Sequence, residues 1–292
     1  MKHLVTIPDT TSKTSGSLVD EYLIAKENIL AGSTFKIASH LLRRFSVDIQ
    51  PCLAENMTYS GIEDWHSSLT RRRFSVGTVY QHLARAKALY TWGVKTNRIE
   101  KSPFIGYDMP YPPNTITHRF YTRQTRDTLF LAAAGTELET ILQLGFYAGL
   151  RYSEIDAAEW DWIGAGGINV RATETWKPKT VSSTRTVPLN SALSAHLQRI
   201  PRIGKYISHP DRPYKPEARY RWDTYRHLKA LAVDHNLTPL TSHMMRRTFA
   251  TLHAMAGTPI TNIARWLGDD IKTTYNHYVG YTIDQKQIDA IC

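Results

Sequence analysis

The sequence predicts a mostly helical chain with a small β-sheet, an α+β fold arranged in two domains. Through most of the 292 residues, apolar side chains recur at three- and four-residue spacings, which is the period of amphipathic helices. One stretch, 166–189, instead alternates and is rich in β-branched residues, which is typical of strands joined by a turn. A cluster of prolines separates the two helical regions and marks a domain boundary.

The first expected domain is helical and covers residues 17–102, after a polar segment, 1–16, that we expect to be flexible. Ser33 is a suitable N-cap for its second helix, because a hydroxyl can accept from an unpaired backbone N–H. Prolines between 103 and 113 exclude a regular helix, so 103–118 is predicted to be the interdomain linker. The helices of this domain are predicted over 18–29, 33–49, 59–69 and 76–96.

The second expected domain covers residues 119–292. Its first helix begins near Thr122, and Gly149 ends the second. A helix that Ser153 could cap follows, and the strand-forming stretch comes next. Later helices are predicted over 191–200, 216–236, 242–257 with Ser242 as its cap, and 258–270.

The chain is basic along its whole length. The formal net charge is +10, with 15 Lys and Arg against 10 Asp and Glu in residues 1–120, and 21 against 16 in the remainder. A positive excess in both halves favours a polyanionic partner, most simply nucleic acid. Charge alone is equally compatible with a basic protein that binds no polyanion.

Composition disfavours several classes of protein. No stretch approaches about 18 consecutive apolar residues, and the N-terminus lacks the apolar core of a signal peptide, so neither a membrane span nor secretion is expected. Cys52 and Cys292 are far apart and form no CxxC pair, which fits a reducing cytoplasm. The 12 histidines show no HExxH or paired Cys/His spacing, so no metal or other cofactor is expected.

Two arginines have the setting of a phosphate clamp. Arg151 follows the helix that Gly149 ends, and Glu154, three residues on, could orient it. His243 and Arg246 are spaced i, i+3 at the start of another helix and share one face. Guanidinium groups bind two phosphate oxygens through parallel hydrogen bonds, and a helix N-terminus also favours phosphate. The ordinary alternatives are a surface arginine in a turn and a solvated helix face.

Four motifs occur in a fixed order: GLRYSEI at 149–155, KPKTVSSTRTVPL at 177–189, HMMRRTFAT at 243–251 and WLGDDIKTTYNHY at 266–278. Together they resemble the tyrosine site-specific recombinases of the phage integrase family. The resemblance covers residues 120–285 and implies that the second domain is catalytic. The helical region before it resembles the family's core-binding domain, which binds DNA, in size, helicity and position.

The resemblance implies a role for several of these residues. Arg151 and Arg246 become the phosphate clamps, with Arg247 the weaker choice, and His243 contacts the phosphate or handles a proton. A lysine of the hairpin protonates the leaving 5′ oxygen. Lys179 fits that pattern better than Lys177, because a threonine follows it and Arg and Pro-Leu come after the turn.

The nucleophile must be chosen among 16 tyrosines. In similar proteins it lies nine residues after the position that follows Leu-Gly, which is Asp269 here, so the spacing selects Tyr278. Tyr275 is the main rival, about one helical turn away, and Tyr281 lies just beyond. A phenol with a pKa of about 10 needs cationic neighbours to attack at neutral pH.

Asp269 departs from the family pattern, which usually has histidine after Leu-Gly, or a tryptophan further on, as a hydrogen-bond donor to the phosphate. An ionised carboxylate cannot donate a hydrogen bond and repels an anion. Asp269 therefore turns away from the phosphate, is protonated, or orients another residue. We predict that it is rotated away from the phosphate in the DNA-free protein. His277, beside the expected nucleophile, is a candidate replacement donor.

The implied reaction is strand exchange through a 3′-phosphotyrosyl intermediate and a Holliday junction, serving integration, excision, inversion or resolution of a mobile genetic element. The implied partners are double-stranded DNA with specific recombination sites, a homotetramer on two such sites, and accessory DNA-bending proteins, without a membrane. The expected location is the cytoplasm of a bacterial, archaeal or phage-infected cell. The alternatives are a type IB topoisomerase-like enzyme, a catalytically impaired DNA-binding homologue and a metal-dependent nuclease.

Overall fold

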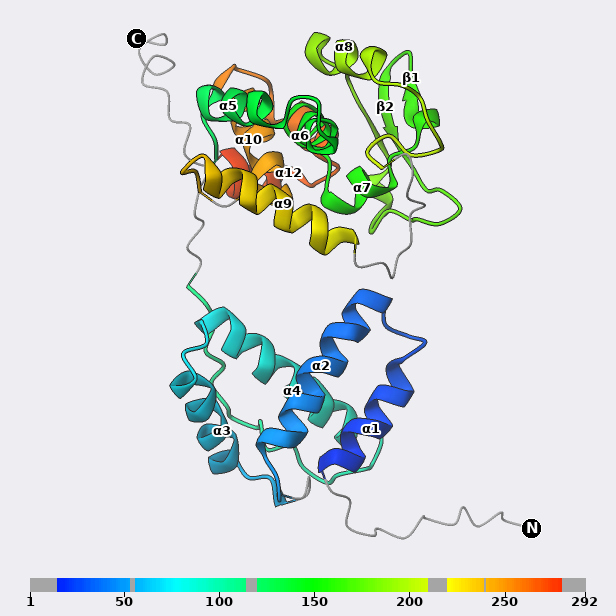
Figure 1. Ribbon diagram of the computed structural model, residues 1–292. Helices are drawn as coiled ribbons and strands as arrows, with labels where there is room; N and C mark the ends of the chain where they lie inside the picture. The colour runs from blue at the N-terminus through cyan, green and yellow to red at the C-terminus, as the bar shows by residue number, and fades with distance from the viewer. Residues whose placement is uncertain (1–14, 53–55, 114–119, 210–219, 239, 280–292) are drawn as a thin grey trace, which may run out of the picture. The chain divides into compact units, whose positions relative to one another are not determined.

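The computed structural model describes residues 15–52, 56–113, 120–209, 220–238 and 240–279. The chain divides into two compact units, Met1–Thr115 and Ile116–Cys292, which are described separately (Figure 1). Both units are built mainly of helices, and a small sheet lies in the second, which confirms the predicted fold class. Within the described ranges, no helix has both the length and the apolar character needed to cross a membrane.

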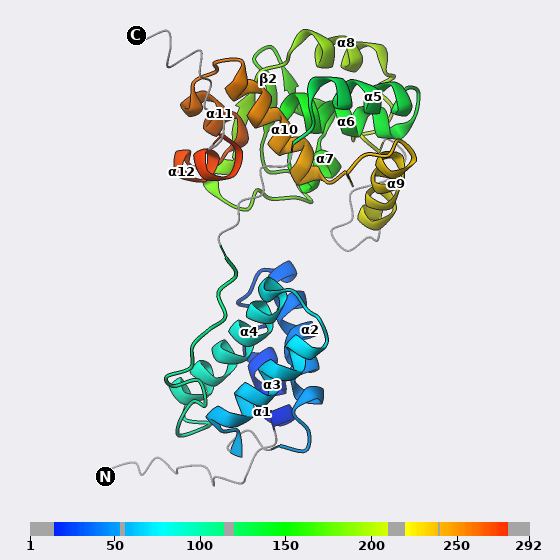
Figure 2. The same ribbon diagram turned by 90° about the vertical axis from the view of Figure 1, so that its left-hand side faces the viewer.

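The described part of the first unit is a helical bundle in which α4 packs against α1, α2 and α3 (Figures 1 and 2). Along α3, Ile62, Trp65 and Leu69 recur at helical spacing and are all buried, which explains why this polar-looking segment forms a helix. The helices are α1 (Ser15–Lys26), α2 (Gly32–Asp48), α3 (Tyr59–Arg71) and α4 (Val76–Lys95).

Helix α2 begins at Gly32, two residues earlier than it would with Ser33 as its N-cap. Its N-cap is Ala31, which makes no side-chain cap hydrogen bond, and Ser33 lies inside the first turn. The prediction of Ser33 as N-cap is therefore wrong, because the chain turns helical at Gly32 and the cap position is set by backbone angles.

Part of the segment expected as a linker packs on the first unit. Phe104 and Tyr107 are buried in the same apolar cluster as Phe45 and Tyr90. The Phe104 and Tyr107 rings meet edge to face with their centroids 5.5 Å apart. As far as Tyr107, the chain is therefore part of the first unit's core.

The described part of the second unit combines helices with a small antiparallel sheet at one side, and α11 (Ile260–Leu267) packs against β3 (Figure 1). The sheet has the order β1–β2–β3, and Val170 pairs with Arg185 across the second pair of strands. The strands are β1 (Ile163–Gly164), β2 (Gly167–Val170) and β3 (Arg185–Val187). Strands β2 and β3 lie within the stretch that alternation predicted, and the loop between them carries both candidate lysines.

The helices of this unit follow the predicted order. They are α5 (Arg123–Ala133), α6 (Glu137–Ala148), α7 (Tyr152–Ala157), α8 (Ser191–Arg199), α9 (Tyr220–Asp234), α10 (Ser242–Met255), α11 (Ile260–Leu267) and α12 (Ile271–Thr274). Two short 3-10 turns, Trp160–Trp162 and Val181–Ser183, accompany the sheet, and a π-helical turn, Tyr275–Val279, follows α12.

Two further N-cap predictions differ from the structure. The N-cap of α7 is Arg151, not Ser153, and Ser153 lies inside the helix. The N-cap of α10 is Thr241, not Ser242, and its hydroxyl accepts from the Met244 N–H at 3.1 Å. Adjacent Thr and Ser are both good caps, so sequence preference alone could not choose between them.

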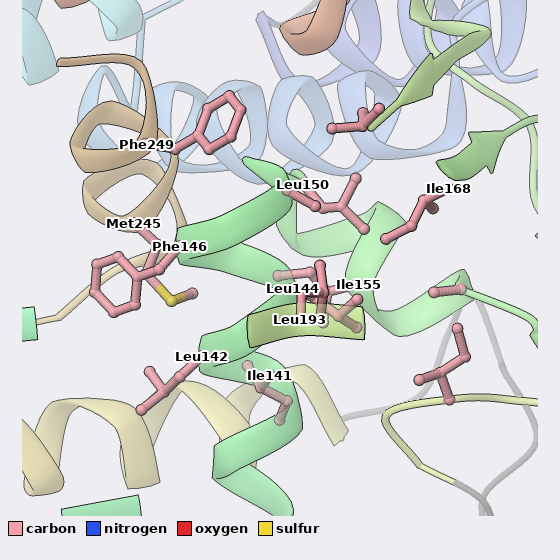
Figure 3. Packing of buried hydrophobic residues seen from close by; sticks show 14 of the residues in the cluster. Ile141, Leu142, Leu144, Phe146, Leu150, Ile155, Ile168, Leu193, Met245 and Phe249 are labelled. Atoms are coloured by element: carbon pink, nitrogen blue, oxygen red, sulfur yellow. The ribbon is translucent and has the colours of Figure 1, made fainter. Parts of the chain in front are cut away.

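Helix α6 is central to this unit and packs against α5, α8 and α10. Figure 3 shows Leu142 and Phe146 of α6 among the buried side chains of the surrounding elements. Its C-cap, Gly149, is left-handed with φ of 60°, and a Cβ at this position would lie 2.7 Å from the Phe249 ring. Only glycine fits here, and the resulting turn directs the chain from the core to Arg151.

Candidate active site

Arg246 joins the ends of two helices. Its guanidinium lies on α10 and is almost fully buried, with 1% of the side chain exposed. Nη1 donates to the carbonyl of Gly149 at 2.7 Å, and Nη2 donates to the carbonyl of Leu267 at 2.5 Å. These carbonyls stand at the C-terminal ends of α6 and α11, where the last carbonyls have no partner within the helix and a cation is favoured.

Arg151 is held by Glu154, as the sequence predicted. Its Nη1 donates to Glu154 Oε1 at 2.9 Å, and its backbone N–H donates to Oε2 at 2.8 Å. Nη1 also donates to Ser183 Oγ at 3.4 Å, from the hairpin. Burial acts to lower the pKa of Arg151, but the nearby Glu154, Asp269 and Tyr278 outweigh it and raise that pKa. The guanidinium is therefore charged at every working pH.

Arg185, on β3, is a site residue that sequence reasoning did not single out. Its Nη1 and Nη2 donate to the two oxygens of Glu154 at 2.9 and 2.8 Å, and its Nε donates to the Trp266 carbonyl at 2.5 Å. Both partners of the Arg185–Glu154 pair are almost fully buried. Arg185 lies within the KPKTVSSTRTVPL motif, and its position after the turn of that motif is the sequence feature that could have marked it as a site residue.

The pair fixes the charge of Glu154. Burial would raise the pKa of this carboxyl, but the hydrogen bonds and charge of Arg185, together with Arg151, lower it to about 2. Burial is the main reason that the pKa of Arg185 is lowered. Glu154 thus remains a carboxylate that orients Arg151 on one side and Arg185 on the other.

Asp269 lies between the two expected clamps. Its Oδ1 accepts from Arg151 Nη2 at 2.5 Å, and its Oδ2 accepts from Arg246 Nη2 at 2.7 Å. The prediction that Asp269 is rotated away is therefore wrong, because its carboxylate pairs with both guanidiniums. The side chain is in hydrogen-bond contact with both arginines.

Gly268 brings this carboxylate and the hairpin together. It is the left-handed C-cap of α11, with φ of 63°. A Cβ there would lie 2.8 Å from the Ser182 carbonyl oxygen and 2.9 Å from Arg185 Cδ. The Leu-Gly pair of the fourth motif therefore has a physical reason: any side chain would separate the hairpin from the turn that carries Asp269.

His243 is on the same end of α10 as Arg246 and is exposed. Partial burial lowers its pKa, and the positive charges of Arg246, Arg247 and Arg151 lower it further, against the opposing effect of Asp269. The imidazole is therefore neutral at neutral pH and can accept a proton.

Tyr278 lies on the π-helical turn after α12 and is half-buried against the apolar core. Its carbonyl accepts from Thr251 Oγ1 of α10 at 2.9 Å, and the residue is close enough to Arg151 to affect that arginine's pKa. Tyr275 on the same turn is 55% exposed. His277 is also exposed, with its ring centroid 6.3 Å from that of Tyr278. Tyr281 lies outside the described residues.

The structure does not choose between the two hairpin lysines. Lys177 and Lys179 are both exposed. Thr180, next to Lys179, has its Oγ1 2.9 Å from Ser183 Oγ, the hydroxyl that Arg151 contacts. Among the residues that the structure describes, no group of three or more His, Cys, Asp or Glu side chains could hold a metal ion.

Comparison with known proteins identifies the family. The model of the phage integrase family matches residues 119–283, which is more than half of the chain. This chain belongs to the phage integrase family. Membership confirms the expected enzyme class, a tyrosine recombinase that acts in site-specific DNA recombination.

Individual relatives agree with this assignment. Tyrosine recombinase XerC of Myxococcus xanthus is 26% identical over 275 residues, covering 85% of this chain and 89% of the relative. The Tn1549 transposon integrase in complex with a circular intermediate DNA is 19% identical, with a TM-score of 0.74 over 96% of this chain and 100% of that chain. A lambda integrase dimer bound to a COC' core site is 14% identical, with a TM-score of 0.75 over 94% and 79%. At these identities the solved structures support the fold.

Proposed function

We propose that this recombinase cuts and rejoins double-stranded DNA through a covalent bond between Tyr278 and the scissile phosphate. The observation that carries the proposal is the convergence of Arg151 and Arg246 on one anionic group, and Tyr278 contributes to the raised pKa of Arg151. Two guanidiniums on one anion form the arrangement that stabilises the charge developing on the nonbridging oxygens of an attacked phosphodiester.

In the proposed reaction, the phenolic oxygen of Tyr278 attacks phosphorus and the bond to the 5′ oxygen breaks. The products are a 3′-phosphotyrosyl bond and a 5′-hydroxyl, which takes its proton from Lys179 as general acid. His243, whose pKa is lowered by burial and by the neighbouring arginines, is the proposed acceptor of the phenolic proton. Because the phosphodiester energy is retained in the tyrosyl bond, rejoining needs no nucleotide hydrolysis.

The same chemistry, applied to two DNA sites in turn, exchanges strands through a Holliday junction. Four protomers on two recombination sites would supply the four tyrosines that this needs, with accessory DNA-bending proteins as further partners. The net charge of +10 supports a DNA partner, and the Tn1549 and lambda integrases were solved in complex with DNA. Integration, excision, inversion and resolution all use this sequence of steps.

A nicked suicide substrate tests the proposal. Tyr278→Phe should form no covalent adduct and should bind target DNA like the wild type, because both clamps are unchanged. Tyr275→Phe is the matched control, since it removes a hydroxyl from the same turn, and it should form adduct normally. Adducts separated on denaturing gels report both results.

The reverse result, with adduct in Tyr278→Phe and none in Tyr275→Phe, would move the nucleophile to Tyr275. Adduct formation that relaxes supercoiled DNA without joining two sites would assign the chain to topoisomerase-like chemistry. If neither the wild type nor either variant forms an adduct, the chain would be a DNA-binding homologue without cleavage activity.

A further inference from the structure

We infer that the Asp269 carboxylate occupies the scissile-phosphate position in the DNA-free enzyme and has to leave it before cleavage. The inference rests on the proposed function of Arg151 and Arg246 as phosphate clamps. Each oxygen of the carboxylate accepts from a different guanidinium, at 2.5 and 2.7 Å. The two nonbridging oxygens of a phosphodiester would bind the same pair of donors.

The arginines do not depend on Asp269 for their positions. Arg246 is anchored to the carbonyls of Gly149 and Leu267, which belong to the ends of two helices. The Arg151 guanidinium is anchored to Glu154 Oε1 at 2.9 Å, and it also donates to Ser183 Oγ at 3.4 Å and to the Gly268 carbonyl at 3.3 Å. Both guanidiniums therefore remain in place when the carboxylate leaves, which is what a replaceable counter-ion requires.

Asp269 has a route away from the clamps. Its side chain is 14% exposed, between Arg246 at 1% and Arg151 at 27%, so the carboxylate reaches solvent on the Arg151 side of the cluster. Its backbone is held independently, because its N–H donates to the carbonyl of Ala264 at 3.1 Å. Rotation about the side-chain bonds can move the carboxylate into solvent without moving the turn.

The charges of the cluster set the sign of the effect. Three arginines (Arg151, Arg185 and Arg246) face two carboxylates (Glu154 and Asp269), so the cluster has one excess positive charge. Removing the Asp269 charge doubles that excess without removing a clamp. An incoming anion would gain attraction and would no longer compete with a resident carboxylate.

The test compares Asp269→Asn with the wild type, using inorganic sulfate as the probe of the DNA-free site. Binding is followed by the rise in melting temperature during sulfate titration, against chloride at matched ionic strength. We expect the affinity for sulfate to rise about tenfold or more, since a neighbouring like charge strongly opposes an anion in a partly dry site. Asp270→Asn is the control: it removes the adjacent exposed charge, and asparagine can still cap α12.

The second measurement is the single-turnover rate of adduct formation on a suicide substrate. Asp269→Asn should cleave faster than the wild type, and Asp270→Asn should match it. Asp269→Ala should behave as Asp269→Asn does, and it replaces that variant if the latter does not fold.

A variant at Asp269 that cleaves more slowly, with unchanged sulfate affinity, would overturn the inference and make the carboxylate a positioning residue. Higher sulfate affinity without faster cleavage would also overturn it, because departure of the carboxylate would then not limit the reaction. If the wild type forms no adduct, the proposed function fails, while the sulfate titration still decides whether Asp269 blocks the anion site.

Discussion

Replacing Glu154 by glutamine should destabilise the second unit in a pH-dependent way. The carboxyl pKa is lowered from 4.5 to about 2, which corresponds to roughly 3 kcal/mol of folding free energy at neutral pH. A group whose folded pKa is depressed contributes stability above its unfolded pKa and loses it as the pH falls through the folded value. The contribution of Glu154 should therefore be complete above about pH 4.5 and absent near pH 2.

The assay is urea denaturation of wild type and Glu154→Gln at several pH values between 7 and 3. At pH 7 the variant should be less stable by roughly 3 kcal/mol, because buried Arg185 loses its anionic partner. The difference in free energy of unfolding between the two proteins should become smaller as the pH falls. Asp161→Asn is a suitable control, since its pair with Arg171 is exposed at both ends, and it should cost less than about 1 kcal/mol.

Two results would refute this reasoning. The first is a difference in free energy of unfolding between wild type and Glu154→Gln that stays constant between pH 7 and pH 3. It would mean that Glu154 has the same pKa in the folded and unfolded states. A Glu154→Gln protein as stable as the wild type at pH 7 would mean that the buried pair makes no net contribution, as some buried ion pairs do.

Two further predictions concern the general acid and the turn at Gly268. Lys179→Ala should lose cleavage of ordinary DNA and should recover cleavage on a substrate with a 5′-bridging phosphorothiolate, because the thiolate leaves without a proton. Equal recovery by Arg151→Ala, or recovery by Lys177→Ala alone, would show that Lys179 is not the general acid. Gly268→Ala should lower the free energy of unfolding by more than Gly257→Ala, because both have positive φ but only Gly268 has backbone within 3 Å of a new Cβ. Equal losses in urea denaturation would show that the close approach at Gly268 is unimportant.

The sequence supported prediction of the fold class and of the residues expected at the site because both depend on local patterns. Apolar periodicity predicted the helices, and alternation located β2 and β3. Arg151, Glu154 and Arg246 were each selected by their position relative to a helix end. The structure brings these three side chains into one cluster, although more than 90 residues separate Arg151 from Arg246.

The features that were missed depend on contacts between distant segments. Arg185 has no local signal that separates a buried ion-pair partner from an exposed strand arginine; its role appears only when β3 lies beside α7. Asp269 was recognised as a departure from the family, but its two partners are 118 and 23 residues away in sequence. Helix periodicity contains no information about either contact.

The anchoring of Arg246 has a consequence for the electric field of the site. Its guanidinium is satisfied by two helix-end carbonyls, Gly149 and Leu267, which are neutral dipoles. Dipoles stabilise a buried cation without cancelling its net charge. The buried guanidinium of Arg246 therefore keeps a positive charge that can still attract a bound phosphate. Residue 269 can then vary and tune the strength of that attraction, whereas loss of Arg246 would remove the charge and leave two helix ends without a donor.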